Sequence, residues 1–173
     1  MPNVFIISDT HFGHENIYQF LHHDGSKARP HGNASTGDQV MIDNWNKVVK
    51  QGDKVYHLGD VVINHKAFSI LHALNGKKVL IKGNHDLFKL KDYTEHFYDI
   101  RAFHKLDNFV LTHIPIHPNS MGRFKGNVHG HLHRNIVTDQ WGMPDLRYKS
   151  ACVELNDYTP VELSVFQQYF LKL

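Results

Sequence analysis

The sequence has one cysteine, Cys152, and no long apolar run. A single cysteine excludes an internal disulfide framework and fits a reducing compartment. A membrane-spanning helix would need about 18 consecutive apolar residues, and the chain has no such stretch. The N-terminus enters the apolar residues 4–7 at once, without the basic stretch and longer apolar run of a signal peptide. These absences predict a cytoplasmic protein without a membrane partner.

An excess of charge of one sign is also lacking. The 19 lysine and arginine residues nearly balance the 17 aspartate and glutamate residues. No basic run has the density of a nucleic-acid-binding arm, so nucleic acid is expected only as a substrate. With 173 residues, 41% of them hydrophobic, the chain suits one domain over residues 1–173. The sequence does not indicate whether this domain forms a homo-oligomer.

Histidine, by contrast, is abundant. The 16 histidines nearly equal all acidic residues in number, and they are dispersed rather than consecutive as in a tag. Neutral imidazole is the commonest side-chain metal ligand, so several of them are expected to bind metal. Others have structural explanations. His57 is expected to be a buried core residue, and His129 is expected to lie behind the site.

Apolar patterning predicts alternating strands and helices in the first half of the chain. Short apolar runs predict strands at residues 4–7, 54–58, 79–81, 109–111, 128–129 and 151–155. Helical spacing predicts helices at residues 16–22, 38–50, 66–74 and 159–171. Asp38 is predicted to cap the second helix, and residues 159–162 are predicted to form a capping box for the last. Trp45 is predicted to pack in the core, whereas Trp141 remains open as a substrate or subunit contact.

Polar clusters follow five of the predicted strand ends. The clusters are Asp9-Thr10-His11, Gly59-Asp60, Gly83-Asn84-His85-Asp86, His113 and Gly130-His131-Leu132-His133. Sites in open α/β sheets form beyond the carboxyl ends of strands, so clusters distant in sequence can converge there. Mixed nitrogen and oxygen ligands suit first-row divalent metals. Taken singly, Asp-x-His and Gly-Asp are more simply explained as solvated turns, but the ordered set predicts a metal site.

This ordered set resembles the calcineurin-like metallophosphoesterase superfamily, and within it the small bacterial and phage phosphoesterases. The superfamily pattern is Asp-x-His, Gly-Asp, Gly-Asn-His-Asp/Glu, His and Gly-His-x-His, and every element occurs here in that order over residues 9–133. The resemblance implies a single-domain α/β fold, arranged as a four-layer α/β/β/α sandwich. It also implies two divalent metal ions, with Mn favoured and Fe, Zn, Ni or Co as alternatives.

The resemblance further implies a role for each polar residue. The residues expected to hold one metal are Asp9, His11 and His133, and those expected to hold the second are Asn84, His113 and His131. Asp60 would bridge both metals. His85 would protonate or stabilise the leaving oxygen, with Asp86 orienting its imidazole. His14 and Arg29 are candidates for contact with phosphate or substrate, although Arg29 is equally well explained as a solvated loop residue.

These roles imply a two-metal phosphoesterase that hydrolyses small phosphodiesters or phosphomonoesters, with nucleotides and cyclic nucleotides favoured. Two cations about 3.5–4 Å apart lower the pKa of a bridging water, and the resulting hydroxide attacks phosphorus. The protein Ser/Thr phosphatases of the superfamily carry Asp-Arg-Gly soon after Gly-Asp, and no such Arg follows Asp60 here, which disfavours phosphoprotein. The alternatives are a metal-dependent nuclease and a metal-binding interaction module without catalysis. The intact His85 argues against the module.

Overall fold

Parallel strands in the first half place the predicted site residues at one edge of a sheet. The computed structural model describes residues 2–22 and 24–173. Its first sheet contains β1 (Val4–Ile7), β2 (Lys54–His57), β3 (Lys77–Ile81), β4 (Asp99–Arg101) and β9 (Val161–Glu162). The strand order is β4-β3-β2-β1-β9, and β1 to β3 pair in parallel as the alternation predicts. β4, which was not predicted, also pairs in parallel with β3. The carboxyl ends of β1, β2 and β3 therefore meet at the same edge.

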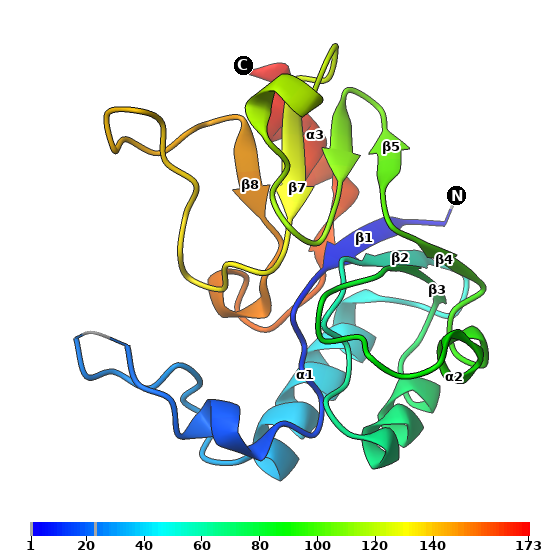
Figure 1. Ribbon diagram of the computed structural model, residues 1–173. Coiled ribbons are helices and arrows are strands. Elements are labelled where there is room, and N and C mark those ends of the chain that lie inside the picture. Colours follow the sequence, from blue (N-terminus) through cyan, green and yellow to red (C-terminus); the bar gives the residue numbers. More distant parts are fainter. Residues whose placement is uncertain (1, 23) are drawn as a thin grey trace.

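The second sheet has four strands in the order β5-β6-β7-β8. They are β5 (His104–Leu106), β6 (Phe109–Leu111), β7 (Gly126–His129) and β8 (Tyr148–Ser150). β5 and β6 are antiparallel, whereas β6, β7 and β8 run parallel. In the first sheet β9 is antiparallel to β1. Both sheets are therefore mixed, and the chain forms one mixed α/β domain (Figure 1).

The strand predicted at residues 151–155 is wrong. The strand β8 ends before it, and Val153–Leu155 form the 3-10 helix η4. The chain leaves the second sheet here because Cys152 forms a bridge with Ser8, just beyond β1. The amide N–H of Val153 also donates to the carbonyl oxygen of Ser8 at 3.1 Å. This crossing joins the two sheets beside the carboxyl end of β1.

Two predicted helices form as 3-10 helices, and a third starts earlier than predicted. The helices are η1 (Glu15–Tyr18), α1 (Ala34–Val48), η2 (His65–His72), α2 (Leu90–Thr94), η3 (Pro118–Ser120), η4 and α3 (Leu163–Leu171). The cap predicted at Asp38 is wrong, because the side chain of Asn33 caps α1 by accepting the Thr36 N–H at 2.9 Å. Asp38 lies inside α1, where its carboxylate accepts the amide N–H of Gly13 at 2.8 Å.

The capping box predicted at residues 159–162 is also wrong. Val161 and Glu162 form β9, which pairs with Ile6 and Phe5 of β1, and α3 begins afterwards without a side-chain cap. Without β9, the outer edge of β1 would present unpaired N–H and C=O groups. Sheet pairing therefore takes precedence over the local capping signal in this segment.

Two cores lie on opposite faces of the first sheet, because alternate residues of a strand point to opposite sides. One core joins the sheet to α1 and η2 through Ile7, Leu80, Met41, Trp45 and Phe68. The other joins the sheet to the second sheet and α3 through Ile6, Val79, Phe109, Val128 and Phe166. Figure 1 shows α1 and α2 on one side of the first sheet and the second sheet on the other. The core position predicted for Trp45 is confirmed.

Within residues 2–22 and 24–173, none of the helices has the length and apolar character that a bilayer crossing requires.

Candidate metal centre

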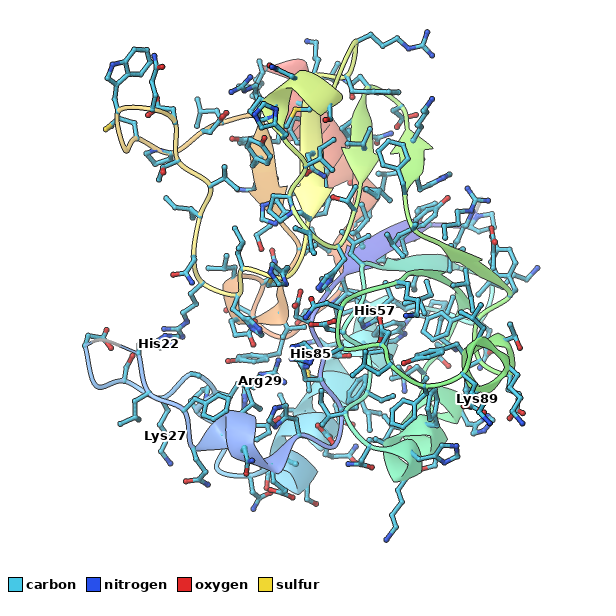
Figure 2. All side chains as sticks on the ribbon, viewed as in Figure 1. His22, Lys27, Arg29, His57, His85 and Lys89 are labelled. Carbon is cyan, nitrogen blue, oxygen red and sulfur yellow. The ribbon has the colours of Figure 1, made fainter. Side chains whose placement is uncertain are left out.

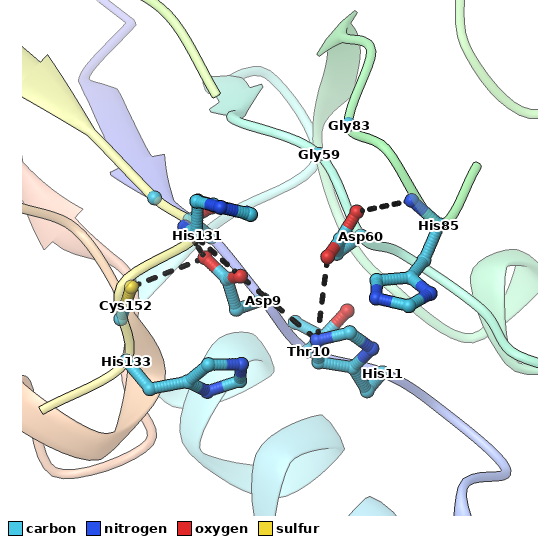
Figure 3. Close-up of polar contacts among 12 residues, drawn as sticks. Asp9, Thr10, His11, Gly59, Asp60, Gly83, His85, His131, His133 and Cys152 are labelled. Carbon is cyan, nitrogen blue, oxygen red and sulfur yellow. Dashed lines mark hydrogen bonds and ion pairs between the residues drawn. The ribbon is translucent and has the colours of Figure 1, made fainter. Parts of the chain in front are cut away.

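The predicted ligands from both sheets converge at the carboxyl ends of their strands. Two groups of side chains have ligand atoms within 4.8 Å of one another, namely Asp9 with His11 and His133, and Asp9 with Asp60 and His113. The first group is the set predicted to hold one metal. Asn84 completes the cluster, since its Oδ1 lies 2.8 Å from His113 Nε2 and 2.9 Å from His131 Nδ1. The structure thus brings all seven predicted ligands together. Figure 3 labels five of them, Asp9, His11, Asp60, His131 and His133.

Five of these ligands have left-handed backbone conformations. The five are Asp9 at φ 59°, His11 at 47°, Asp60 at 57°, His131 at 71° and His133 at 51°. Residues other than glycine rarely adopt this region, and such residues cluster at functional sites where the surrounding structure holds them. Only three other non-glycine residues of the described chain share it: Asp107, Asp157 and Tyr158. The strained backbone therefore marks the same residues as the sequence motifs.

Asp60, a member of the second group, lies between His113 of that group and His11 of the first. Its Oδ2 is 3.5 Å from His11 Nε2, and its Oδ1 is 3.4 Å from His113 Nε2. Each carboxylate oxygen thus faces an imidazole of a different group. The side chain is only 2% exposed, so the two oxygens are largely shielded from water. This geometry fits the bridging role that the sequence predicts for Asp60.

His11 has the properties of a metal ligand. Both of its ring nitrogens are buried and lack a hydrogen-bond partner among the described residues. Burial, and after it the positive charge of Arg29, lowers the pKa of His11 well below 6.5, so the ring is neutral. A neutral imidazole can donate a lone pair to a metal, and buried polar atoms normally have a partner. The donor set of His11, Asp9 and Asp60 therefore fits a divalent cation.

His113 is oriented by a backbone carbonyl. Its Nδ1 lies 2.7 Å from the carbonyl oxygen of Leu58, which can only accept a hydrogen bond, so Nδ1 carries the proton. In the neutral ring, Nε2 then presents its lone pair toward Asn84 Oδ1 and Asp60 Oδ1. Three acceptor atoms facing one another suit a cation held among them.

Glycines allow this close packing of ligands. A Cβ atom at Gly83 would overlap the carboxylate of Asp60, and one at Gly130 would overlap Ser8 and the carboxylate of Asp9. Any larger residue would therefore displace a ligand. The structure thus gives a steric reason for two of the glycines in the motifs.

Arg29 is not available for the substrate contact that the sequence suggested. Its side chain is 0% exposed, and its guanidinium donates to the carbonyl oxygens of Asp9 at 2.6 Å and Thr10 at 2.7 Å. It also donates twice to Glu154 Oε1, at 2.9 and 2.8 Å. These contacts use four of the five N–H groups of the buried guanidinium within the protein. Arg29 therefore positions the backbone that carries the first ligands.

Glu154 is the functional residue that the sequence did not indicate. Its side chain is 2% exposed, and Oε1 also accepts a hydrogen bond from His133 Nδ1 at 3.1 Å. Burial opposes ionisation of Glu154, but the His133 imidazole and the Arg29 guanidinium hold its pKa below 4.5. A carboxylate behind a ligand imidazole fixes the orientation of the ring. Glu154 belongs to no sequence motif and lies 125 residues from Arg29, so only the fold reveals it.

Asp86 does not orient the His85 ring as predicted. Both of its oxygens accept backbone N–H groups, from Asp60 at 2.9 Å, Val61 at 3.0 Å and Gly83 at 2.7 Å. The carboxylate is fully buried and therefore holds the loops after β2 and β3 together. His85 itself donates its backbone N–H to Asp60 Oδ1 at 2.8 Å, and its exposed ring lies 5.6 Å from the His11 ring.

The remaining predicted residues lie around this centre. The His14 ring meets the His11 ring edge-on at 5.9 Å, and its Nδ1 accepts the Ile17 N–H at 3.2 Å. His57 is 1% exposed and contacts Thr10 Oγ1 at 3.0 Å, which confirms it as a core residue. His129 is 2% exposed, with Nδ1 2.8 Å from the Gly130 carbonyl oxygen, behind the ligands as expected.

Comparison with known proteins identifies relatives over nearly the full chain. No protein-family model matches the sequence. The chain is 33% identical over 171 residues to the uncharacterized protein MJ1445 of Methanocaldococcus jannaschii, an alignment that covers 95% of this chain and 89% of the relative. Among solved structures, it is similar to the protein of unknown function AQ665 from Aquifex aeolicus, with a TM-score of 0.73 and 28% identity. That match covers 97% of this chain and 99% of the other.

Proposed function

We propose that this chain, which belongs to the same family as the uncharacterized protein MJ1445 of Methanocaldococcus jannaschii, is a two-metal-dependent phosphoesterase. The position of Asp60 between two groups of imidazoles carries the proposal. The order of the motifs supports membership of the calcineurin-like superfamily, and the two sheets packed face to face fit its four-layer sandwich. The substrates proposed are small phosphodiesters or phosphomonoesters, with nucleotides and cyclic nucleotides favoured.

The donor atoms support two first-row divalent ions, with Mn favoured. One ion would be held by Asp9, His11 and His133, the other by Asn84, His113 and His131, and both by Asp60. When bound, such ions polarise the phosphate oxygens and activate water for attack on phosphorus. Burial raises the pKa of the Cys152 thiol, which donates a hydrogen bond to Asp9 Oδ2 at 3.1 Å and so remains protonated. As the single cysteine, Cys152 can form no internal disulfide, which fits the cytoplasmic location that the sequence predicts.

The side chains around the ligands have two kinds of role in this proposal, proton transfer and support of the ligands. The exposed His85 ring would give a proton to the leaving oxygen, and its backbone N–H donates to Asp60 Oδ1. Arg29 holds the Asp9-Thr10 backbone, and Glu154 orients the His133 ring. Asp86 holds the Asp60 loop through backbone N–H groups. Buried groups thus fix the ligands, and an exposed imidazole remains for proton transfer.

A metal-dependent substrate screen tests this function. The protein loaded with Mn is offered p-nitrophenyl phosphate, bis-p-nitrophenyl phosphate, and 2′,3′- and 3′,5′-cyclic nucleotides. We expect hydrolysis of at least one of them, with loss of turnover on chelation. Absence of turnover from protein shown to contain two metal ions would contradict the proposal, and nicking of plasmid DNA under the same conditions would identify a nuclease instead.

A further inference from the structure

Two clefts open on either side of the metal centre. The first has a volume of about 470 Å³ and is lined by His11 and His85 and, on its far wall, by Phe20 and Leu21. The second has a volume of about 370 Å³, and its lining includes Asn84, His113, Phe103 and Ile114. Figure 2 labels His22, which follows Phe20 and Leu21 in the wall of the first cleft, and His85, which lines the same cleft.

Asp60 lines neither cleft itself, but its carboxylate lies between a residue of the first and a residue of the second. Its Oδ2 faces His11, which lines the first cleft, and its Oδ1 faces His113, which lines the second. The consecutive residues Asn84 and His85 likewise line different clefts. A phosphate placed at the ligands therefore has one cleft on each side.

Each cleft has an exposed aromatic ring beside an exposed aliphatic side chain. Phe20 is 53% exposed and Leu21 64% in the first cleft, and Phe103 is 39% exposed and Ile114 51% in the second. The Phe20 ring is supported edge-on by His14 at 5.9 Å, and its carbonyl oxygen accepts the Ala28 N–H at 2.8 Å. An exposed aromatic ring beside a polar site provides a surface on which a planar group of a ligand can stack.

From this arrangement we infer that the substrate is a phosphodiester with a planar aromatic group on each side of the phosphate, such as a dinucleotide. The inference rests on the proposed function and names its substrate class. The phosphate lies at the metal ligands, and each substituent occupies one cleft. A phosphomonoester would leave one apolar wall uncovered. Lys82, which also lines the second cleft, suits the anionic character of such a ligand.

The position of His85 determines which of the two phosphorus–oxygen ester bonds breaks. Because His85 lines the first cleft, the substituent there is the leaving group. The phosphorus–oxygen bond to that substituent breaks as the oxygen of water bonds to phosphorus and both O–H bonds of that water break. His85 gives the leaving oxygen one proton and regains one from the water, and the second water proton is released to solvent as the monoester dianion forms. The substituent in the second cleft stays on the phosphate as the monoester product.

Binding measurements on ring-deletion variants test this inference without relying on turnover. Diphenyl phosphate, a diester with a poor leaving group, is titrated by calorimetry into the protein loaded with Mn, and inorganic phosphate serves as a ligand that enters neither cleft. We expect Phe20→Ala and Phe103→Ala each to weaken diphenyl phosphate binding by about tenfold, within the range for loss of a stacking aromatic, and to leave phosphate binding unchanged. In the double variant the two factors multiply.

Trp141→Ala is the matched control. Trp141 is 77% exposed and lines a different cleft, with His117 and Arg147, that includes none of the metal ligands. It should leave both affinities unchanged. Unchanged diphenyl phosphate binding in either phenylalanine variant would overturn the two-sided substrate, and so would equal weakening of phosphate and diester. Failure of the wild type to hydrolyse any ester would instead overturn the proposed function, whatever the binding result.

Discussion

Several residues of the candidate metal centre have strained backbone conformations, and buried side chains hold that backbone in place. Left-handed conformations at residues such as Asp9 and Asp60 cost roughly 1–3 kcal/mol each. Arg29 holds the Asp9 carbonyl, and Asp86 holds the amide N–H of Asp60. From sequence, Arg29 was a candidate for substrate contact or a solvated loop residue, and Asp86 was predicted to orient the general acid. Their buried contacts make them supports for the ligands instead.

The first prediction concerns the buried pair of Arg29 and Glu154. Arg29→Met leaves the Glu154 carboxylate without its guanidinium partner, and removal of one member of a buried pair costs about 3–5 kcal/mol. The free energy of unfolding in urea is measured for Arg29→Met, Glu154→Leu and the double variant. The double variant should lose less free energy of unfolding than the sum of the losses in the two single variants. If Arg29→Met kept full stability and raised only KM, Arg29 would be a substrate contact after all.

The second prediction concerns His85 as the general acid. His85→Gln should lower kcat by about 10²–10⁴-fold for esters with poor leaving groups, because such esters depend on proton donation. The loss should be much smaller for p-nitrophenyl esters, whose leaving oxygen needs no proton. Metal content measured by plasma mass spectrometry should stay at two ions per chain. Equal losses for both classes of ester would rule out proton donation by His85.

At the scale of elements, segments with a local signal form as predicted and segments set by a distant partner do not. The run at residues 109–111 is β6, and Asp9 and Asp60 follow β1 and β2 because apolar runs and their polar ends are adjacent in sequence. The start of α3 was missed because β9 forms to cover β1, and η4 was missed because Cys152 bridges to Ser8. Those partners are more than 140 positions away in the chain.

The third prediction concerns Asp38 within α1. Burial raises the pKa of Asp38 from 3.8 to about 6, so the folded state favours the protonated carboxyl. Its contribution to stability is complete below pH 3.8 and is lost as pH rises toward about 6. Asp38→Asn keeps an oxygen to accept the Gly13 N–H but does not titrate. The difference in free energy of unfolding between Asp38→Asn and the wild type should therefore shift in favour of the variant by roughly 1 kcal/mol or more from pH 4 to pH 7.

Urea unfolding at both pH values measures this gain. The matched control is Asp43→Asn, an exposed position on the same helix, which should show a smaller difference. A gain for Asp38→Asn that is the same at pH 4 and pH 7 would contradict the raised pKa.

At the scale of the whole molecule, the two sheets share one centre. Asp9, His11, Asp60 and Asn84 follow strands of the first sheet, whereas His113, His131 and His133 follow strands of the second. Their order along the chain predicted the site because each lies at a strand end. The packing that brings the second sheet against the first, and the two flanking clefts, depends on contacts across the molecule and has no local signal.

The fourth prediction follows from ligands supplied by both sheets. Ions that bind only the folded state stabilise it by RT ln(1 + [L]/Kd), about 2.7 kcal/mol for each site at a hundredfold excess over Kd. Calorimetric melting should therefore show a Tm that rises with Mn concentration and falls again with chelator. A Tm that stays constant while Mn binds would show that the unfolded chain binds the ions as well as the folded one, which would contradict a site assembled by the fold.

The most direct test of a shared two-metal centre is the metal content of Asp60→Asn, measured together with its turnover. Asp60 is the side chain whose two oxygens face the two groups of ligands, so its loss should weaken binding of both ions and abolish hydrolysis, with the far-UV circular dichroism unchanged. Asp43→Asn should retain two ions and full activity. An Asp60→Asn protein that still held two ions and turned over substrate normally would contradict the account.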